Sequence, residues 1–179
     1  MTRFDPEILL AGVLYDGRYA ADGLIAGVAN RLQQRGWRLA GVVQANETYD
    51  PLCPCDMQLV DLSGGASLRI SQRLGQHARG CRLDPDALSR AVAMTETALP
   101  GADMLIVNKF GKAEAAGYGF RPVIAEALAN GTPVLAGVSQ TNLAAFNAFA
   151  AGMGVMLPAE AKEIERWIEG HGIRGAAVA

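Results

Sequence analysis

The chain contains 179 residues, of which half are hydrophobic and 19% are charged, so it can bury a core and is not a disordered chain. Its formal net charge of −2 gives no electrostatic reason to expect a nucleic-acid partner. No apolar run reaches the length of a membrane span and three cysteines cannot all pair within one chain, so we expect a soluble, reduced, cytoplasmic protein with no membrane partner.

Apolar runs alternate along the chain with segments of helical periodicity. Residues 8–15 (ILLAGVLY) are almost continuously apolar, which predicts a strand buried on both faces. Further strands are predicted at residues 37–44, 104–110, 132–138 and 154–157, and helices at residues 20–35, 85–99, 120–130, 142–151 and 159–169. This alternation predicts a three-layer α/β domain with a mainly parallel sheet.

One segment interrupts this alternation. Residues 57–62 and 67–71 read as two short strands around Ser63-Gly64-Gly65-Ala66, which predicts a β-hairpin inserted into the α/β core at about residues 56–72. We expect one domain over residues 1–170 and a tail over residues 171–179. Phe146, Phe149 and Trp167 have helical spacing and are expected in the core or in a homodimer contact.

The turn after the first strand is the first candidate binding site. Its spacing, G-x-x-x-x-G-[basic]-x, resembles a phosphate-binding loop, in which backbone amides and a helix N-terminus hold phosphates. Arg18 stands where such loops have Lys, and Tyr19 where they have the Ser or Thr that holds Mg²⁺. Ordinary turn glycines are the alternative explanation. The candidate contacts are Gly12, Tyr15, Asp16, Gly17, Arg18 and Tyr19.

A second group of candidates lies at the end of the strand predicted at residues 104–110. Asn108 and Lys109 interrupt this apolar strand at its carboxyl end, and Lys112 and Glu114 follow it. Ligands of open α/β sheets bind beyond the carboxyl ends of strands, so we expect these residues to face the same crevice as the first loop. A solvated charged turn is the alternative.

The segment ADMLIVNKFGKAEAAGYGFRPVIAEALANGTPVLAGV resembles the Walker B region of small thermophile-type nucleoside-triphosphatases. Gly111, Lys112 and Glu114 match that family's pattern, whereas Asn108 and Lys109 replace its acidic pair. Residues 8–157 resemble more closely a bacterial family known as a domain of unknown function, often encoded near molybdenum-transport genes. This resemblance includes the motifs GCRLD at residues 80–84 and NKFGKAEAAGYGFR at residues 108–121.

The resemblance implies a P-loop NTPase-like fold with degenerate Walker motifs. The first expectation is a protein that binds a nucleotide such as ATP or GTP, phosphate or another oxyanion, with weak or absent hydrolysis and a doubtful Mg²⁺ site. One alternative is a molybdenum-related accessory protein that binds molybdate or a pterin-type ligand. Another is a divergent, active nucleoside-triphosphatase that uses Lys109 or Lys112.

The cysteines and histidines are weaker candidates. Cys53 and Cys55 form a Cys-x-Cys pair that could join His77 or Cys81 in a metal site, but no second paired motif is present, so we expect free thiols and no metal. His171 is expected at the surface.

Asp84 precedes Pro85, which predicts a helix N-cap followed by proline at the first helical position. Arginines nearby form either a solvated basic face or a small-anion site. They are Arg69, Arg73, Arg79 and Arg82.

Overall fold

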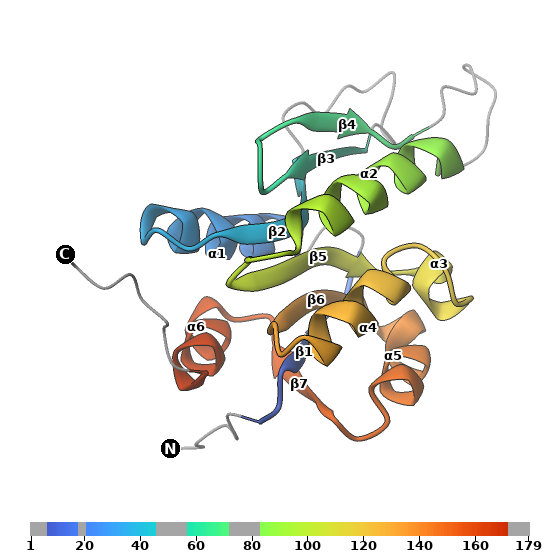
Figure 1. The fold of residues 1–179 in the computed structure, drawn as a ribbon. Helices are drawn as coiled ribbons and strands as arrows, with labels where there is room; N and C mark the ends of the chain where they lie inside the picture. The colour runs from blue at the N-terminus through green and yellow to red at the C-terminus, as the bar shows by residue number, and fades with distance from the viewer. Residues whose placement is uncertain (1–6, 18–20, 46–56, 72–82, 172–179) are drawn as a thin grey trace.

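The computed structural model describes residues 7–17, 21–45, 57–71 and 83–171 (Figure 1). Within them a seven-stranded sheet has the order β4-β3-β2-β5-β6-β1-β7. The strands are β1 (Leu10–Tyr15), β2 (Leu39–Ala45), β3 (Gln58–Asp61), β4 (Ser67–Arg69), β5 (Met104–Phe110), β6 (Val134–Ser139) and β7 (Gly154–Pro158). The helices are α1 (Asp22–Gln34), α2 (Pro85–Ala98), α3 (Lys112–Ala115), α4 (Arg121–Ala129), α5 (Leu143–Ala150) and α6 (Ala161–Gly170).

The central strands of the sheet are parallel. β1 pairs with β6 and β7, and β5 pairs with β2 and β6, all in the same direction. The chain therefore leaves β1 and crosses by α1 to β2, which lies on the far side of β6 and β5. The predicted α/β fold with a mainly parallel sheet is confirmed, and the predicted strands and longer helices are all present with ends that differ by two residues or fewer.

Helices cover both faces of the sheet, as Figure 1 shows. On one face, α2, α4 and α5 pack on a core that includes Leu105, Val107 and Phe110. On the other face, α1 and α6 pack on a core that includes Val13 and Ile106. Side chains of β1 and β5 therefore alternate between two apolar layers, which explains why both strands read as continuous apolar runs.

The predicted hairpin is confirmed and extends the sheet. β3 pairs antiparallel with β4 and also with β2, so the hairpin continues the sheet beyond its parallel part. The Asp61 carboxylate fixes the turn, because Oδ2 accepts hydrogen bonds from Ser63 Oγ at 2.7 Å and from Gly64 N at 2.8 Å. Asp commonly stabilises a turn by accepting such hydrogen bonds from the residues that follow it.

The predicted start of α2 is also confirmed. Asp84 Oδ1 accepts hydrogen bonds from the backbone N–H groups of Asp86 at 3.0 Å and Ala87 at 3.3 Å, and Pro85 opens the helix. This N-cap satisfies two donors that the first turn leaves without helical partners.

His171, expected at the surface, is only partly exposed, because its ring contacts two backbone carbonyl groups. Nδ1 lies 2.7 Å from the Trp167 carbonyl oxygen and Nε2 lies 2.6 Å from the Ile8 carbonyl oxygen. The ring also packs on Trp167, with 4.5 Å between centroids. A single polar histidine gives no sequence signal for such a contact, because Ile8 is distant in the chain.

Candidate functional site

β1 extends into the segment that resembles a phosphate-binding loop, so the turn itself begins only after Tyr15. Tyr15 is the last residue of β1, and Asp16 and Gly17 follow it in exposed positions. Gly17 has φ +91°, a left-handed conformation that favours glycine at this turn. Arg18 and Tyr19 lie outside the described residues, so their predicted contacts stay predictions.

Gly12 lies within β1 rather than in the turn, and packing explains the absence of a side chain there. A Cβ at this position would lie 2.7 Å from Met156 Sδ and 2.9 Å from Phe146 Cε1. Gly12 therefore lets β7 and α5 approach β1 closely. The two glycines whose spacing resembles a phosphate-binding loop thus have different roles, because Gly12 allows close packing and Gly17 allows the turn.

A β-bulge shapes the carboxyl end of β5. Val107 is opposite Ala136 and Phe110 is opposite Val138, so Asn108 and Lys109 together face the single residue Gly137. A Cβ on Gly137 would lie 2.3 Å from the Asn108 carbonyl oxygen, so glycine makes room for the bulged backbone. Bulges re-aim side chains, and this one lets neighbouring residues of β5 turn toward the same partners.

Lys109 and Asp22 form an ion pair across this edge of the sheet. Lys109 Nζ lies 3.2 Å from Asp22 Oδ1 and 3.3 Å from Oδ2, and it donates to Gln44 Oε1 at 3.0 Å. Asp22 belongs to the first turn of α1, where the helix dipole favours a carboxylate. Its side chain is 2% exposed and that of Lys109 is 27% exposed, so Lys109 is the more accessible partner of the pair.

Asn108 connects the members of this cluster. Its Nδ2 donates to Asp22 Oδ1 at 3.0 Å, and its Oδ1 accepts from the backbone N–H of Gln44 at 2.9 Å. The cluster of Asp22, Gln44, Asn108 and Lys109, called here the edge cluster, therefore joins α1, β2 and β5 at the carboxyl edge. The start of α1 and the end of β5 thus come together at this edge, whereas the expected meeting of Arg18 with Lys109 stays a prediction.

Two members of the edge cluster, Gln44 and Asp22, were not among the residues predicted from the sequence. Gln44 ends the strand predicted at residues 37–44, so the rule that picked out Asn108 and Lys109 also applies to it. Asp22 falls in the first turn of a predicted helix, where acidic residues are common for purely structural reasons.

Tyr15 adds an uncharged hydroxyl to the same edge. Its partner in the parallel register is Ser139 at the end of β6. Burial and the negative charge of Asp22 raise the pKa of Tyr15 to about 12, against the opposing effect of a hydrogen bond with the Ser139 side chain. Tyr15 therefore remains protonated at neutral pH.

Glu114 orders the loop after β5. Its Oε2 accepts from Gly111 N at 2.8 Å and its Oε1 accepts from Phe120 N at 2.9 Å, and the side chain is buried. The two carboxylate oxygens thus hold the backbone on either side of α3. Lys112 differs from Glu114, because it is exposed and has no ion-pair partner within the described part of the chain.

An apolar pocket of about 190 Å³ opens beside the edge cluster. Residues of β2, β5, the hairpin region and α2 line it, including Val42, Leu59, Ile70, Leu88, Val107 and Phe120. Asn108, Lys109 and Lys112 also line this pocket, here called the edge pocket. Apolar walls with a few convergent polar groups are typical of small-molecule sites, and this volume suits one ring of a ligand.

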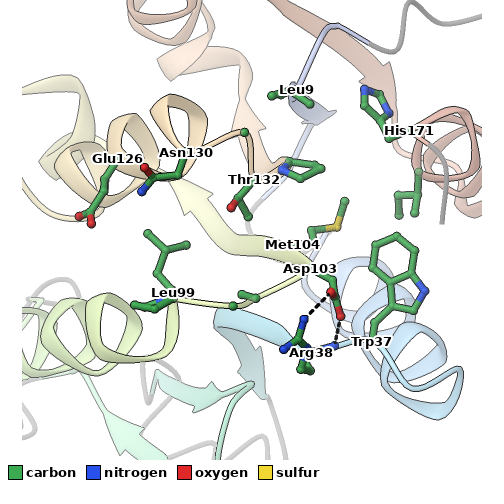
Figure 2. A pocket seen from close by; sticks show the side chains of 16 residues that line it. Leu9, Trp37, Arg38, Leu99, Asp103, Met104, Glu126, Asn130, Thr132 and His171 are labelled. Atoms are coloured by element: carbon green, nitrogen blue, oxygen red, sulfur yellow. Dashed lines mark hydrogen bonds and ion pairs between the residues drawn. The ribbon is translucent and has the colours of Figure 1, made fainter. Parts of the chain in front are cut away.

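A separate cavity of about 780 Å³ lies at the opposite, amino-terminal edge of the sheet (Figure 2). There Asp103 accepts from Arg38 Nη2 at 3.1 Å and from Arg38 N at 2.8 Å. Desolvation raises the pKa of Asp103, but the hydrogen bonds and charge of Arg38 outweigh it and hold the pKa below its ordinary value. This ion pair joins the starts of β2 and β5, whereas ligands of such sheets bind at the other edge.

The described residues contain no group of three or more His, Cys, Asp and Glu side chains arranged to hold a metal ion. Cys53, Cys55, Cys81 and His77 lie outside the described part, as do Arg73, Arg79 and Arg82. None of the described helices is both long enough and apolar enough to cross a membrane.

Comparison with solved structures agrees with the topology. THEP1 from the hyperthermophile Aquifex aeolicus matches with a TM-score of 0.62 over 89% of this chain and 94% of that chain. The two sequences are 13% identical, so the likeness concerns the fold alone. The expected α/β fold is thereby confirmed.

Two sequence comparisons identify relatives. The chain is 38% identical over 159 residues to the molybdenum import ATP-binding protein ModC 2 of Bradyrhizobium diazoefficiens, and the match covers 88% of this chain but 18% of that protein. The chain thus spans less than a fifth of that relative. The sequence pattern of a family described as "Protein of unknown function (DUF2478)" matches residues 10–167. The chain therefore belongs to the DUF2478 family, whose fold it shares with THEP1.

Proposed function

We propose that this protein binds a phosphorylated small molecule, most simply a nucleoside di- or triphosphate, at the carboxyl edge of its sheet. The observation that carries the proposal is the juxtaposition of the edge pocket with two ammonium groups, those of Lys109 and Lys112. The pocket accepts the apolar ring and the ammonium groups attract the phosphates. The relative's name, which includes ATP binding, agrees with this proposal, although the chain matches only part of that protein.

The geometry favours weak or absent hydrolysis. P-loop enzymes use acidic residues after this strand to hold Mg²⁺ and to orient the attacking water. Here those positions are Asn108 and Lys109, and the nearby carboxylate of Asp22 is engaged by both of them. The Glu114 carboxylate holds backbone N–H groups on both oxygens, so it is not a general base.

Calorimetric titration with ATP, ADP, GTP and GDP tests the proposal. Wild type is expected to bind at least one of them, and Lys109→Met is expected to weaken binding about tenfold or more through loss of a charge-assisted contact. Lys162→Met is the matched control, because Lys162 is an exposed lysine on α6. Absence of nucleotide binding by wild type, or equal binding by Lys109→Met, contradicts the proposal.

The edge pocket provides a second test. Met57 lines the pocket and is partly exposed, so Met57→Trp is expected to fill the pocket and weaken binding of a ring-bearing ligand. Met153→Trp makes the same change at an exposed site and is expected to have no effect. If Met57→Trp binds nucleotides as tightly as wild type does, the ring lies elsewhere.

A molybdenum-related role is the second candidate, and the name of the Bradyrhizobium relative favours it. A bare oxyanion such as molybdate would use the ammonium groups and leave the edge pocket empty, whereas a pterin-type ligand would fill it. Thermal unfolding with molybdate, a pterin and ADP in parallel distinguishes these ligands, because a bound ligand raises the melting temperature. If only molybdate raises the melting temperature, the function is oxyanion binding and the proposal of nucleotide binding is wrong.

A further inference from the structure

The donor set at the carboxyl edge does not fit Mg²⁺, the metal that the P-loop fold implies. Mg²⁺ requires near-octahedral oxygen ligands, usually one or two carboxylates with water and phosphate oxygens. The side-chain oxygens of the edge cluster belong to Asp22, Gln44 and Asn108, and each of them already has a hydrogen-bond partner. Asn108 Oδ1, a neutral oxygen that could otherwise be a weak ligand, accepts the Gln44 backbone N–H.

The Lys109 ammonium occupies the position that a cation would take. It lies 3.0–3.3 Å from three oxygens, two of the Asp22 carboxylate and one of the Gln44 side chain. Because Lys109 is the more exposed partner and Asp22 is almost fully buried, a divalent ion from solvent would meet the ammonium before the carboxylate. Placing a divalent cation beside the positively charged ammonium is strongly unfavourable because the like charges repel.

Resting on the function proposed above, we propose that Lys109 is a built-in replacement for the divalent cation, so that the protein binds the phosphates of its ligand without a metal. The β5 bulge places Lys109, while Asp22 and Gln44 anchor its ammonium, and the ligand meets this lysine where it lines the edge pocket. The ligand class is therefore the metal-free phosphate ester rather than its magnesium complex.

Manganese binding tests the inference without any nucleotide. Mn²⁺ followed by electron paramagnetic resonance is expected to show no stoichiometric site at Asp22 in wild type. Lys109→Met removes the ammonium and exposes Asp22, so this variant is expected to gain one Mn²⁺ site that a second change, Asp22→Asn, removes. One equivalent of Mn²⁺ bound by wild type and lost in Asp22→Asn would overturn the inference, and circular dichroism verifies that each variant is folded.

Nucleotide titration gives a second readout. The affinity of wild type for ADP is expected to change by less than about threefold between buffer with EDTA and buffer with Mg²⁺. Binding that is about tenfold tighter with Mg²⁺, or that occurs only with it, would overturn the inference. Absence of binding in both buffers would instead contradict the proposed function, and the manganese result would then decide the inference alone.

Discussion

The ion pair between Lys109 and Asp22 has two roles that separate experiments can distinguish. Under the proposed function it offers an ammonium to the ligand, and in the free protein it neutralises a carboxylate that is 2% exposed. A buried carboxylate without its cation is destabilising, because neither water nor a counter-charge then compensates it. The pair should therefore contribute to the stability of the free protein as well as to ligand binding.

We expect Lys109→Met to lower the free energy of unfolding by about 2 kcal/mol, below the range for a fully buried pair because the lysine is partly exposed. The measurement is urea denaturation at neutral pH. Lys109→Met combined with Asp22→Asn should regain most of the loss, because no charge is then left uncompensated. If the single and double variants are equally destabilised, the ion pair contributes nothing beyond the packing of the lysine stem.

The raised pKa of the Tyr15 phenol predicts that this residue ionises at a more alkaline pH than an exposed tyrosine does. Its pKa of about 12, raised from 10.0 chiefly by burial, means that the folded protein favours the neutral phenol. The corresponding stability is fully present below pH 10 and is lost as the pH rises from 10 to about 12, where the unfolded chain ionises first. Phenolate absorbance of wild type minus that of Tyr15→Phe should show a transition near pH 12. A difference transition near pH 10 would contradict the burial argument.

At the scale of elements, the β5 bulge explains why Asn108 and Lys109 act together. Neighbouring residues of a regular strand point to opposite faces of the sheet, so one of the two would otherwise face away from Asp22. The bulge depends on Gly137 in β6, which faces both residues. A sequence alone does not reveal this dependence, because the two segments are far apart in the chain and a glycine in a strand has several explanations.

Gly137→Ala should therefore disturb the edge cluster through the backbone of Asn108. The added Cβ would lie 2.3 Å from the Asn108 carbonyl oxygen and 3.0 Å from Ile25 Cδ1, so the backbone of β5 must shift and the end of the Ile25 side chain must move. We expect a loss of about 2 kcal/mol in the free energy of unfolding and weaker nucleotide binding.

Gly23→Ala is the control for this prediction. It makes the same change in the first turn of α1, where no atom outside the local helix lies within 4 Å of the added Cβ. Its stability should be equal to or slightly above that of wild type. If Gly137→Ala were as stable as Gly23→Ala, the close approach of β6 to Asn108 would not constrain the bulge.

At the scale of the whole molecule, periodicity predicted the order of the elements correctly. Long apolar runs and helical stripes are local signals, and parallel pairing follows from their alternation. The site was predictable only in part, since Lys109 and Asn108 stand out as polar residues in an apolar strand, whereas Asp22 and Gln44 look ordinary until the fold brings them together. The likeness of fold to THEP1 at 13% identity agrees with a fold that is easier to predict than a site, because many sequences can supply the same pattern of buried and exposed positions.

The contact of His171 shows a long-range constraint that also escapes sequence patterns. The ring joins the end of α6 to the chain entering β1 through two carbonyl oxygens, those of Trp167 and Ile8. Carbonyl oxygens only accept hydrogen bonds, and a neutral imidazole has a single N–H, so the ring donates to one of the two oxygens in its neutral form and to both only when protonated. Trp167, which is fully buried between the helices and the sheet, lies directly beneath it.

We expect His171→Ala to lower the free energy of unfolding by about 1–2 kcal/mol, with the effect concentrated in α6. Hydrogen exchange should become faster for the last turn of α6 and for the residues that open β1, because the contact that holds them together is gone. Exchange in α2, which packs on the other face of the sheet, serves as the internal control. His171→Gln retains one donor and should be less affected than His171→Ala. Equal acceleration in α2 and α6 would mean that the histidine stabilises the fold globally rather than tying its two ends, and no acceleration at all would mean that the contact contributes nothing.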